Sequence, residues 1–260
     1  MYGRGNVSIG PPITPPIVKN LMIANAVVFV AQGFLPWIND LGAASPAAFW
    51  LGSYIWQPFT YMWLHGGLMH IGFNMLALWM FGSQLAMTWG EKRFLRYYLF
   101  CGVGAGFVIV SLPWLPVLGG WSVPGDSLTI PTVGASGAVM GVLLAFAFTW
   151  PDRTVMLLFP PIPLKAIWLI PLIFVMDLMG PRSATISHIG HLGGVVVGWI
   201  YLVREGRTPG APTLDSLVHK FKRYRMRQKL RMVHNKERRD QKERWQKRNE
   251  EEDDDRPRFH

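Results

Sequence analysis

The sequence predicts an all-α membrane protein with six membrane-spanning helices and both termini on the cytoplasmic side. Three observations support this: the uneven distribution of charge, six apolar segments, and the unequal share of basic residues in successive loops. The first 203 of 260 residues contain only eight Lys/Arg and five Asp/Glu, whereas a soluble domain carries about 25% charged residues. Most of the net charge of +10 lies in residues 204–260. A basic excess beyond the last apolar run is typical of a cytoplasmic tail, so we expect no nucleic-acid partner.

The six apolar segments comprise residues 17–37, 67–89, 94–117, 135–150, 164–179 and 186–203. A helix needs roughly 20 apolar residues to span a bilayer. The last three segments are short or interrupted, which predicts a compact bundle with some helix ends below the membrane surface.

The loops between these segments predict the orientation. If the N-terminus lies inside, the outside loops contain one basic residue, Arg182, and the inside loops contain the others. This is the positive-inside distribution. In and beside the outside loops 38–64 and 118–134 lie aromatic residues suited to the membrane interface. They are Trp50, Tyr54, Trp56, Phe59, Tyr61, Trp63, Trp114 and Trp121.

These patterns divide the chain into a short extension (1–16), a six-span domain (17–203) and a basic tail (204–260). Leu217, Phe221 and Tyr224 have helical spacing, so the tail is expected to be partly helical or disordered. It is either a solvated extension or a segment that contacts anionic lipid headgroups. The single Cys excludes a disulfide framework and a Cys-based zinc cluster. The N-terminal sequence does not resemble a cleavable signal peptide.

A polar motif, HGGLMHIGFN from His65 to Asn74, overlaps the start of the second segment. His70 and Asn74 are four residues apart and share one helix face. His65 falls near the opposite face, so we expect it at the helix start, where it would hold the outer loop. Polar groups in a membrane span are costly and therefore indicate function.

The fourth segment opens with Gly134-Ala135-Ser136-Gly137. One interpretation is helix packing, because Gly137 and Gly141 have the GxxxG spacing. The other is a catalytic serine, because a Gly/Pro-rich loop precedes a short span. Ser136 would then begin a helix below the membrane surface, where irregular backbone is tolerated only inside protein or beside a wet cavity.

The sixth segment contains His191 beside a stripe formed by Gly190, Gly194 and Gly198. Such a stripe allows close helix contact, which could bring His191 within hydrogen-bond distance of Ser136. A neutral histidine has a pKa suited to removing the serine proton. The Asn74 and His70 side chains and the Ser136 N–H could stabilise an oxyanion. No acidic residue lies near His191 in the sequence, so the pattern indicates a dyad.

At this point the sequence resembles the rhomboid family of intramembrane serine proteases. Three separated motifs carry the resemblance: HGGLMHIGFN at His65–Asn74, GASG at Gly134–Gly137, and GHLGGVVVG at Gly190–Gly198. The resemblance implies Ser136 as nucleophile and His191 as general base. It implies His70, Asn74 and the Ser136 amide as the oxyanion site, and His65 as support for the outer loop. Family members cleave single-span membrane proteins in or next to the membrane.

Two positions depart from the family pattern. Met140 stands where many members carry an aromatic residue that packs on the histidine, which predicts weaker orientation of His191. Trp56-Gln57-Pro58 stands where many members carry Trp-Arg, which changes the hydrogen bonding expected in the first outer loop.

The resulting prediction is a serine endopeptidase in a prokaryotic plasma (inner) membrane, with its site facing outside. It would act on transmembrane substrates in the lipid bilayer with no cofactor or metal. One alternative is an inactive member of the family that binds membrane clients. Another is a metal site or transporter, although the HExxH pattern of zinc proteases is absent. Its polar groups would be His65, His70, His188, His191 and Asp177. The simpler role of Asp177 is capping of a loop, and the simpler role of His188 is support of a loop.

Overall fold

The structure is a computed structural model that describes residues 11–122, 127–156, 162–179 and 188–205, with a few positions of the tail. It divides into two compact units, Met1–Ala211 and Pro212–His260. In the second unit the described residues are helical and exposed. They are Arg223, 225–228, Met232 and Arg238. The first unit contains the predicted membrane domain and is described below.

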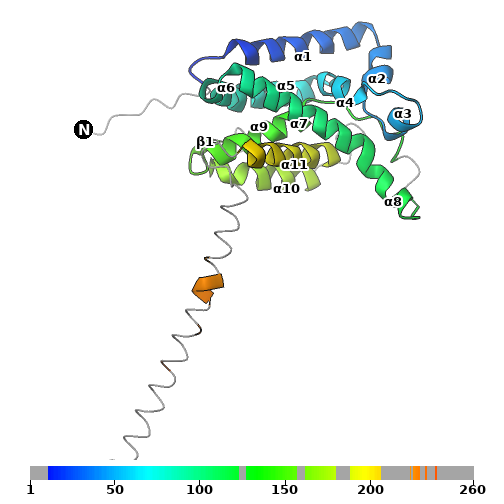
Figure 1. The fold of residues 1–260 in the computed structure, drawn as a ribbon. Coiled ribbons are helices and arrows are strands. Elements are labelled where there is room, and N and C mark those ends of the chain that lie inside the picture. Colours follow the sequence, from blue (N-terminus) through cyan, green and yellow to red (C-terminus); the bar gives the residue numbers. More distant parts are fainter. Residues whose placement is uncertain are drawn as a thin grey trace, which may run out of the picture. The chain divides into compact units, whose positions relative to one another are not determined.

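Each of the six apolar segments coincides with a helix or a run of helices (Figure 1). The elements are α1 (Pro16–Phe34), α5 (Leu68–Ala77) with the π-helical turn η2 (Leu78–Gly82) and α6 (Ser83–Trp89), α7 (Glu91–Ser111), α9 (Ser136–Thr149), α10 (Leu169–Met179) and α11 (His188–Glu205). Two described stretches, Pro16–Phe34 and Glu91–Leu118, are long and apolar enough to cross a membrane. The count of six spans and the orientation stay predictions.

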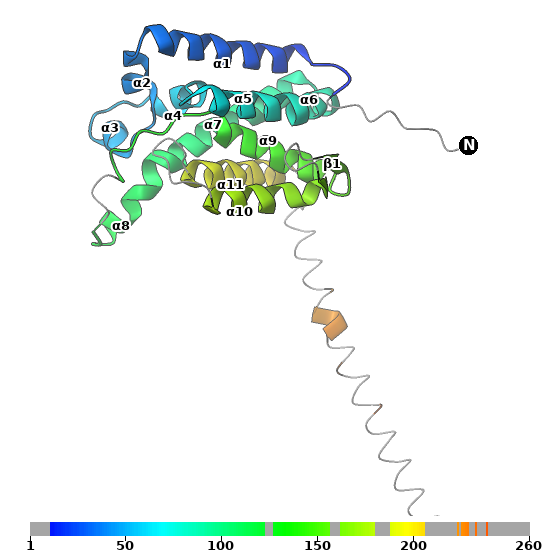
Figure 2. The same cartoon turned by 180° about the vertical axis from the view of Figure 1, so that it is seen from behind.

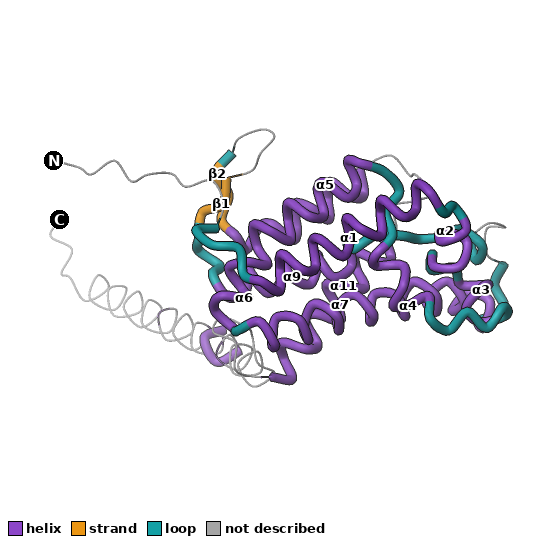
Figure 3. The backbone as a smooth tube through the Cα atoms, turned by 90° about the horizontal axis from the view of Figure 1, so that it is seen from above, coloured by secondary structure: helices purple, strands orange, loops and turns teal. Residues whose placement is uncertain are grey.

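Helix α9 lies at the centre of the unit. Every residue from Gly137 to Ala147 is buried, as expected of a helix that is apolar on all sides. Figures 1 and 2 show α1 on one face, α5 and α6 beneath it, and α10 and α11 on the opposite face. Figure 3 shows α1, α5 and α7 running alongside one another. The outer side of α1 exposes large apolar residues, including Val27 and Phe34, which suits a lipid-facing surface.

Short helices build the connection between α1 and α5. They are α2 (Trp37–Gly42), α3 (Pro46–Trp50), α4 (Gln57–Thr60) and η1 (Tyr61–Trp63). Ala44 and Thr132 exchange two main-chain hydrogen bonds of 2.9 and 2.8 Å, and Ala47 N–H donates to Leu128 O at 2.8 Å. The first outer loop is therefore bonded directly to the segment that leads into α9.

Tyr61 lies inside the protein and not at the membrane interface predicted for it. Its side chain is buried, and its hydroxyl donates to Gly102 O on α7 at 2.7 Å. Trp50 and Trp121 are exposed, as an interfacial position requires. Tyr61 is buried because η1 packs against α7, where the phenol finds a carbonyl partner.

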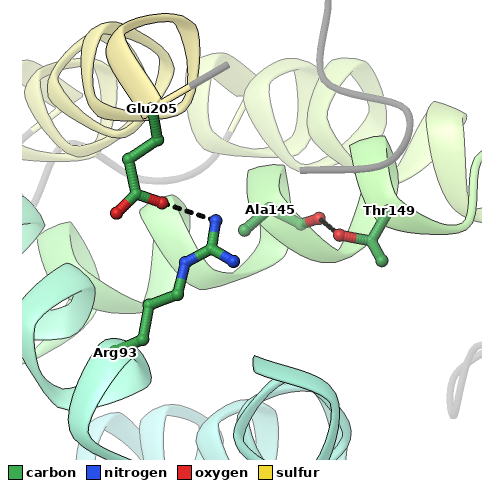
Figure 4. A network of polar contacts seen from close by, with 4 residues as sticks. All are labelled: Arg93, Ala145, Thr149 and Glu205. Atoms are coloured by element: carbon green, nitrogen blue, oxygen red, sulfur yellow. Dashed lines mark hydrogen bonds and ion pairs between the residues drawn. The ribbon is translucent and has the colours of Figure 1, made fainter. Parts of the chain in front are cut away.

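The opposite end of the bundle contains a hairpin that the sequence did not predict. Strands β1 (Thr154–Met156) and β2 (Pro163–Lys165) pair antiparallel and lead through η4 (Ala166–Trp168) into α10. Near this end an ion pair joins Arg93 of α7 to Glu205 of α11 at 2.5 Å. Figure 4 shows this pair beside the end of α9, where Thr149 donates to Ala145 O. The remaining short elements, η3 (Leu112–Trp114) and α8 (Leu115–Leu118), extend α7.

Candidate active site

Ser136 is the first residue of α9 and is half-buried. Its N–H is therefore among the donors at a helix start that have no acceptor within the helix. The preceding backbone is held in place, because Gly134 N–H donates to Tyr61 O at 3.0 Å. The serine hydroxyl and its amide thus lie together at the start of the buried central helix.

Gly134 brings the Ser136 hydroxyl next to the imidazole of His70. Its φ of +131° lies in the region that only glycine adopts readily. A Cβ at this position would lie 2.7 Å from Cε1 and Nε2 of His70 and 3.6 Å from Ser136 Oγ. The His70 and Ser136 side chains therefore both lie next to Gly134, although they are 66 positions apart in the sequence.

The hydrogen bonding of His70 determines which ring nitrogen carries the proton. Gly66 N–H donates to His70 Nδ1 at 3.3 Å, so in the neutral ring Nδ1 is the acceptor and Nε2 carries the hydrogen. Nε2–H lies on the side of Gly134 and Ser136. Asn74 is buried on the next turn, and its Nδ2 donates to His70 O at 3.0 Å. That bond uses one of the two amide hydrogens of Asn74.

Helix α11 brings His191 to this place through glycine contacts with α9. The Gly137 Cβ position lies 3.4 Å from Gly190 O, and a Cβ on Gly194 would overlap the carbonyl oxygen of Gly137. Ser136 and His191 are the immediate chain neighbours of Gly137 and Gly190. His191 also lies close enough to His70 to interact with it electrostatically. The predicted glycine stripe therefore brings the two helices together beside the candidate dyad.

His65 lies before α5 and is 3% exposed. Its main chain pairs with the side chain of Gln32, and its ring meets His70 edge-on with centroids 5.2 Å apart. Burial, and to a lesser degree the neighbouring His70, lower the pKa of His65 to about 4. The imidazole is therefore neutral near pH 7.

The remaining predicted residues lie in the core of the bundle, at helix contacts or at the start of α11. Met140 is buried in the core of the bundle, and the Gly198 Cβ position lies 3.2 Å from Gly141 Cα. His188 begins α11 and is half-buried, whereas the side chain of Asp177 lies outside the described residues. Across the described ranges, no three His, Cys, Asp or Glu side chains are grouped to hold a metal ion.

Sequence reasoning missed the buried Gln32 of α1 and did not predict the hydrogen-bond partner of the buried Gln57. Gln32 bonds to His65, and Gln57 Oε1 accepts from Ser45 N at 3.1 Å. The neighbouring Trp56 donates to Leu41 O at 2.9 Å, so the Trp-Gln pair makes its own hydrogen bonds in this loop. A polar residue inside an apolar segment is a signal that could have singled out Gln32.

Comparison with known proteins identifies the family. The rhomboid domain model matches residues 52–207, which is more than half of the chain. The chain belongs to the rhomboid family. It is therefore a helical integral membrane protein, and the matched region includes every predicted site residue from His65 to Gly198.

Three curated rhomboid proteins resemble the chain. Mitochondrial rhomboid protein 1 of Saccharomyces cerevisiae is 34% identical over 140 residues, 53% of this chain and 38% of the relative. Chloroplastic rhomboid-like protein 16 of Arabidopsis thaliana is 31% identical over 204 residues, 74% and 63% of the two chains. Rhomboid protease GluP of Bacillus subtilis is 31% identical over 145 residues, which are 55% of this chain and 25% of the relative.

The matched regions span less than two thirds of each of these relatives. The expectation of a prokaryotic plasma membrane is weakened, because two of the three belong to mitochondria and chloroplasts.

Proposed function

We propose that the protein is an intramembrane serine endopeptidase that cleaves single-span membrane proteins. The observation that carries the proposal is the arrangement around Gly134. The Ser136 hydroxyl and the His70 ring border this glycine, and the contact between Gly137 and α11 brings His191 alongside. A serine at a helix start beside two histidines has the components of acyl transfer. The likeness to a relative named as a rhomboid protease supports the same function.

In the proposed reaction, His191 accepts the proton of Ser136 as the serine oxygen attacks the scissile carbonyl carbon. The resulting tetrahedral intermediate collapses, the peptide C–N bond breaks, and His191 gives the proton to the leaving amine. Water, deprotonated by the same histidine, then hydrolyses the acyl-enzyme and restores the serine. A dyad suffices because a neutral imidazole is itself a suitable base near pH 7.

The oxyanion would be stabilised by three donors. They are the Ser136 N–H, His70 Nε2–H and the second hydrogen of the Asn74 amide. The hydrogen bond from Gly66 supports this role, since it leaves the proton of neutral His70 on Nε2. Losing one oxyanion donor typically lowers kcat by about 10²–10³-fold.

The substrate would be a membrane helix that unwinds at the outer end of the bundle. An intact helix hides its carbonyl carbons from a nucleophile, so the segment around the scissile bond must become extended. The outer loops would control entry. One of them comprises residues 118–134, and its Leu128 and Thr132 form hydrogen bonds with the first outer loop.

The test uses the full chain in liposomes with a labelled single-span substrate. Wild type should cleave it, whereas Ser136→Ala and His191→Ala should each lower the rate by at least about 10³-fold. Thr149→Ala, which removes a hydroxyl from the far end of the same helix, should leave the rate nearly unchanged. The competing function is client binding without cleavage. A folded wild type that binds the substrate and cuts no faster than Ser136→Ala would contradict the protease.

A further inference from the structure

We infer that Gln32 is a positioning residue, which orients His70 for oxyanion stabilisation through the peptide group between His65 and Gly66. The inference rests on the proposed function and extends it to a residue of α1. Gln32 lies 38 positions before His70 in the sequence and acts through hydrogen bonds alone.

The Gln32 carboxamide pairs with the main chain of His65 at two points. His65 N–H donates to Gln32 Oε1 at 3.0 Å, and Gln32 Nε2 donates to His65 O at 3.2 Å. The second amide hydrogen of Gln32 is directed to Asn39 Oδ1 at 2.5 Å. The side chain is 9% exposed. With two acceptors facing Nε2 and one donor facing Oε1, this hydrogen-bond network selects one orientation of the amide.

The peptide group transmits this orientation to His70. The carbonyl of His65 and the N–H of Gly66 belong to one planar unit, and in a trans peptide they point in opposite directions. Gln32 holds the carbonyl end, so the N–H end is directed at His70 Nδ1. Bonding at the carbonyl also polarises the peptide, which makes its N–H a better donor.

The consequence for His70 is a fixed ring and a fixed tautomer. With Nδ1 accepting, Nε2 carries the hydrogen that faces Gly134 and Ser136. The other neutral tautomer would direct a lone pair at the developing oxyanion and would repel it. A loosened His65–Gly66 peptide would therefore reduce the stabilisation of the transition state more than it reduces the affinity for the substrate.

The chemistry of this position requires a carboxamide. Leucine has a similar size but offers neither the donor nor the acceptor, so the His65 N–H and C=O would lose their partners. Asparagine retains both groups on a shorter side chain that cannot reach the same atoms. Both substitutions remove the pairing without adding charge.

The experiment is a double-mutant cycle on the full chain in liposomes, with cleavage of the single-span substrate as the readout. Gln32→Leu should lower kcat by about 10- to 100-fold with KM nearly unchanged, less than complete loss of an oxyanion donor would cost. In a His70→Ala background, Gln32→Leu should lower kcat by no more than about twofold, because groups that act as a unit are non-additive. Gln84→Leu is the matched control, since the Gln84 side chain donates to Met80 O one turn earlier and, among the described residues, has no bond to the His65–His70 segment.

The outcomes separate the inference from the proposed function. Equal losses from Gln32→Leu in the presence and absence of His70 would overturn the inference and indicate a merely structural role. A parallel rise in KM, or a loss that Gln84→Leu shares, would also overturn it. If Gln32→Leu does not fold, Gln32→Asn replaces it in the same cycle. A folded wild type without cleavage dependent on Ser136 would overturn the proposed function itself, and the inference with it.

Discussion

At the scale of single residues, Gly134 has no space for a side chain beside the candidate catalytic residues. Gly134→Ala would place a methyl group 2.7 Å from the His70 ring on a backbone with φ of +131°. The strain costs about 1–3 kcal/mol, and the displaced ring would leave the oxyanion site. We expect cleavage to fall by at least about 10²-fold, measured in liposomes alongside the melting temperature.

Gly72→Ala is the control for this prediction. Gly72 lies on α5 with His70 and has open space where a Cβ would be placed. The substitution should leave activity unchanged and slightly raise stability, because alanine favours a helix. Equal activity of the Gly134→Ala and Gly72→Ala variants would show that cleavage does not depend on the present position of the His70 ring.

His65 gives a prediction for the dependence of stability on pH. Its pKa is near 4 in the folded protein and about 6.5 in the unfolded chain. The unfolded chain therefore binds the proton first, so the stabilisation is complete above pH 6.5 and is lost as pH falls towards 4. The loss is roughly 3 kcal/mol, since each pKa unit corresponds to about 1.4 kcal/mol.

The measurement is the melting temperature in detergent between pH 7.5 and 4. Wild type should lose stability more steeply than His65→Gln, which has no proton to bind at this site. Parallel pH profiles for the two proteins would exclude His65 as the group responsible.

At the scale of secondary-structure elements, the contact between α9 and α11 sets the relative position of the candidate dyad residues. A Cβ on Gly194 would overlap the carbonyl of Gly137, so Gly194→Ala must push the helices apart. Overpacking of this kind costs about 1–3 kcal/mol. We expect a lower melting temperature and a loss of cleavage that exceeds the loss of folded protein, because Ser136 and His191 separate.

Gly33→Ala is the control for the helix contact, because Gly33 has no atom within 4 Å of its Cβ position. A Gly194→Ala protein that retains wild-type turnover would contradict the role of this contact in the site.

The helices could be predicted from the sequence because each apolar segment is a continuous local signal. The candidate serine, both histidines and the glycine stripe were also visible, because they are polar or small residues at a recognisable spacing. Gln32 was missed because its partner lies 33 residues away and only the fold brings them together. Tyr61 was assigned to the interface because composition cannot distinguish a wet aromatic residue from one buried against a carbonyl.

At the scale of the whole molecule, the apolar outer surface and the basic tail indicate how the protein meets its membrane. Residues 220–239 contain ten Lys/Arg and one Glu, and the described arginines among them are exposed. A basic residue near an anionic bilayer contributes about 1 kcal/mol. We therefore predict that the tail contacts anionic headgroups when the protein lies in a membrane that contains them.

This prediction is measured as the rate at which trypsin cleaves the tail of the full chain in nanodiscs. Anionic lipid should slow cleavage relative to neutral lipid, and high salt should remove the difference. Replacing Arg223, Arg225 and Arg227 together with Gln should reduce the protection. Equal cleavage rates in both lipids would contradict lipid contact by the tail.

The most direct test of the catalytic site is reaction of the purified protein with a fluorophosphonate probe, followed by mass spectrometry of the labelled peptide. Such probes react with a serine whose hydroxyl is activated by a neighbouring base. We predict a label on Ser136 of the wild type, and none on Ser136→Ala or on folded His191→Ala. A label on another residue, or labelling of Ser136 that persists without His191, would contradict the dyad.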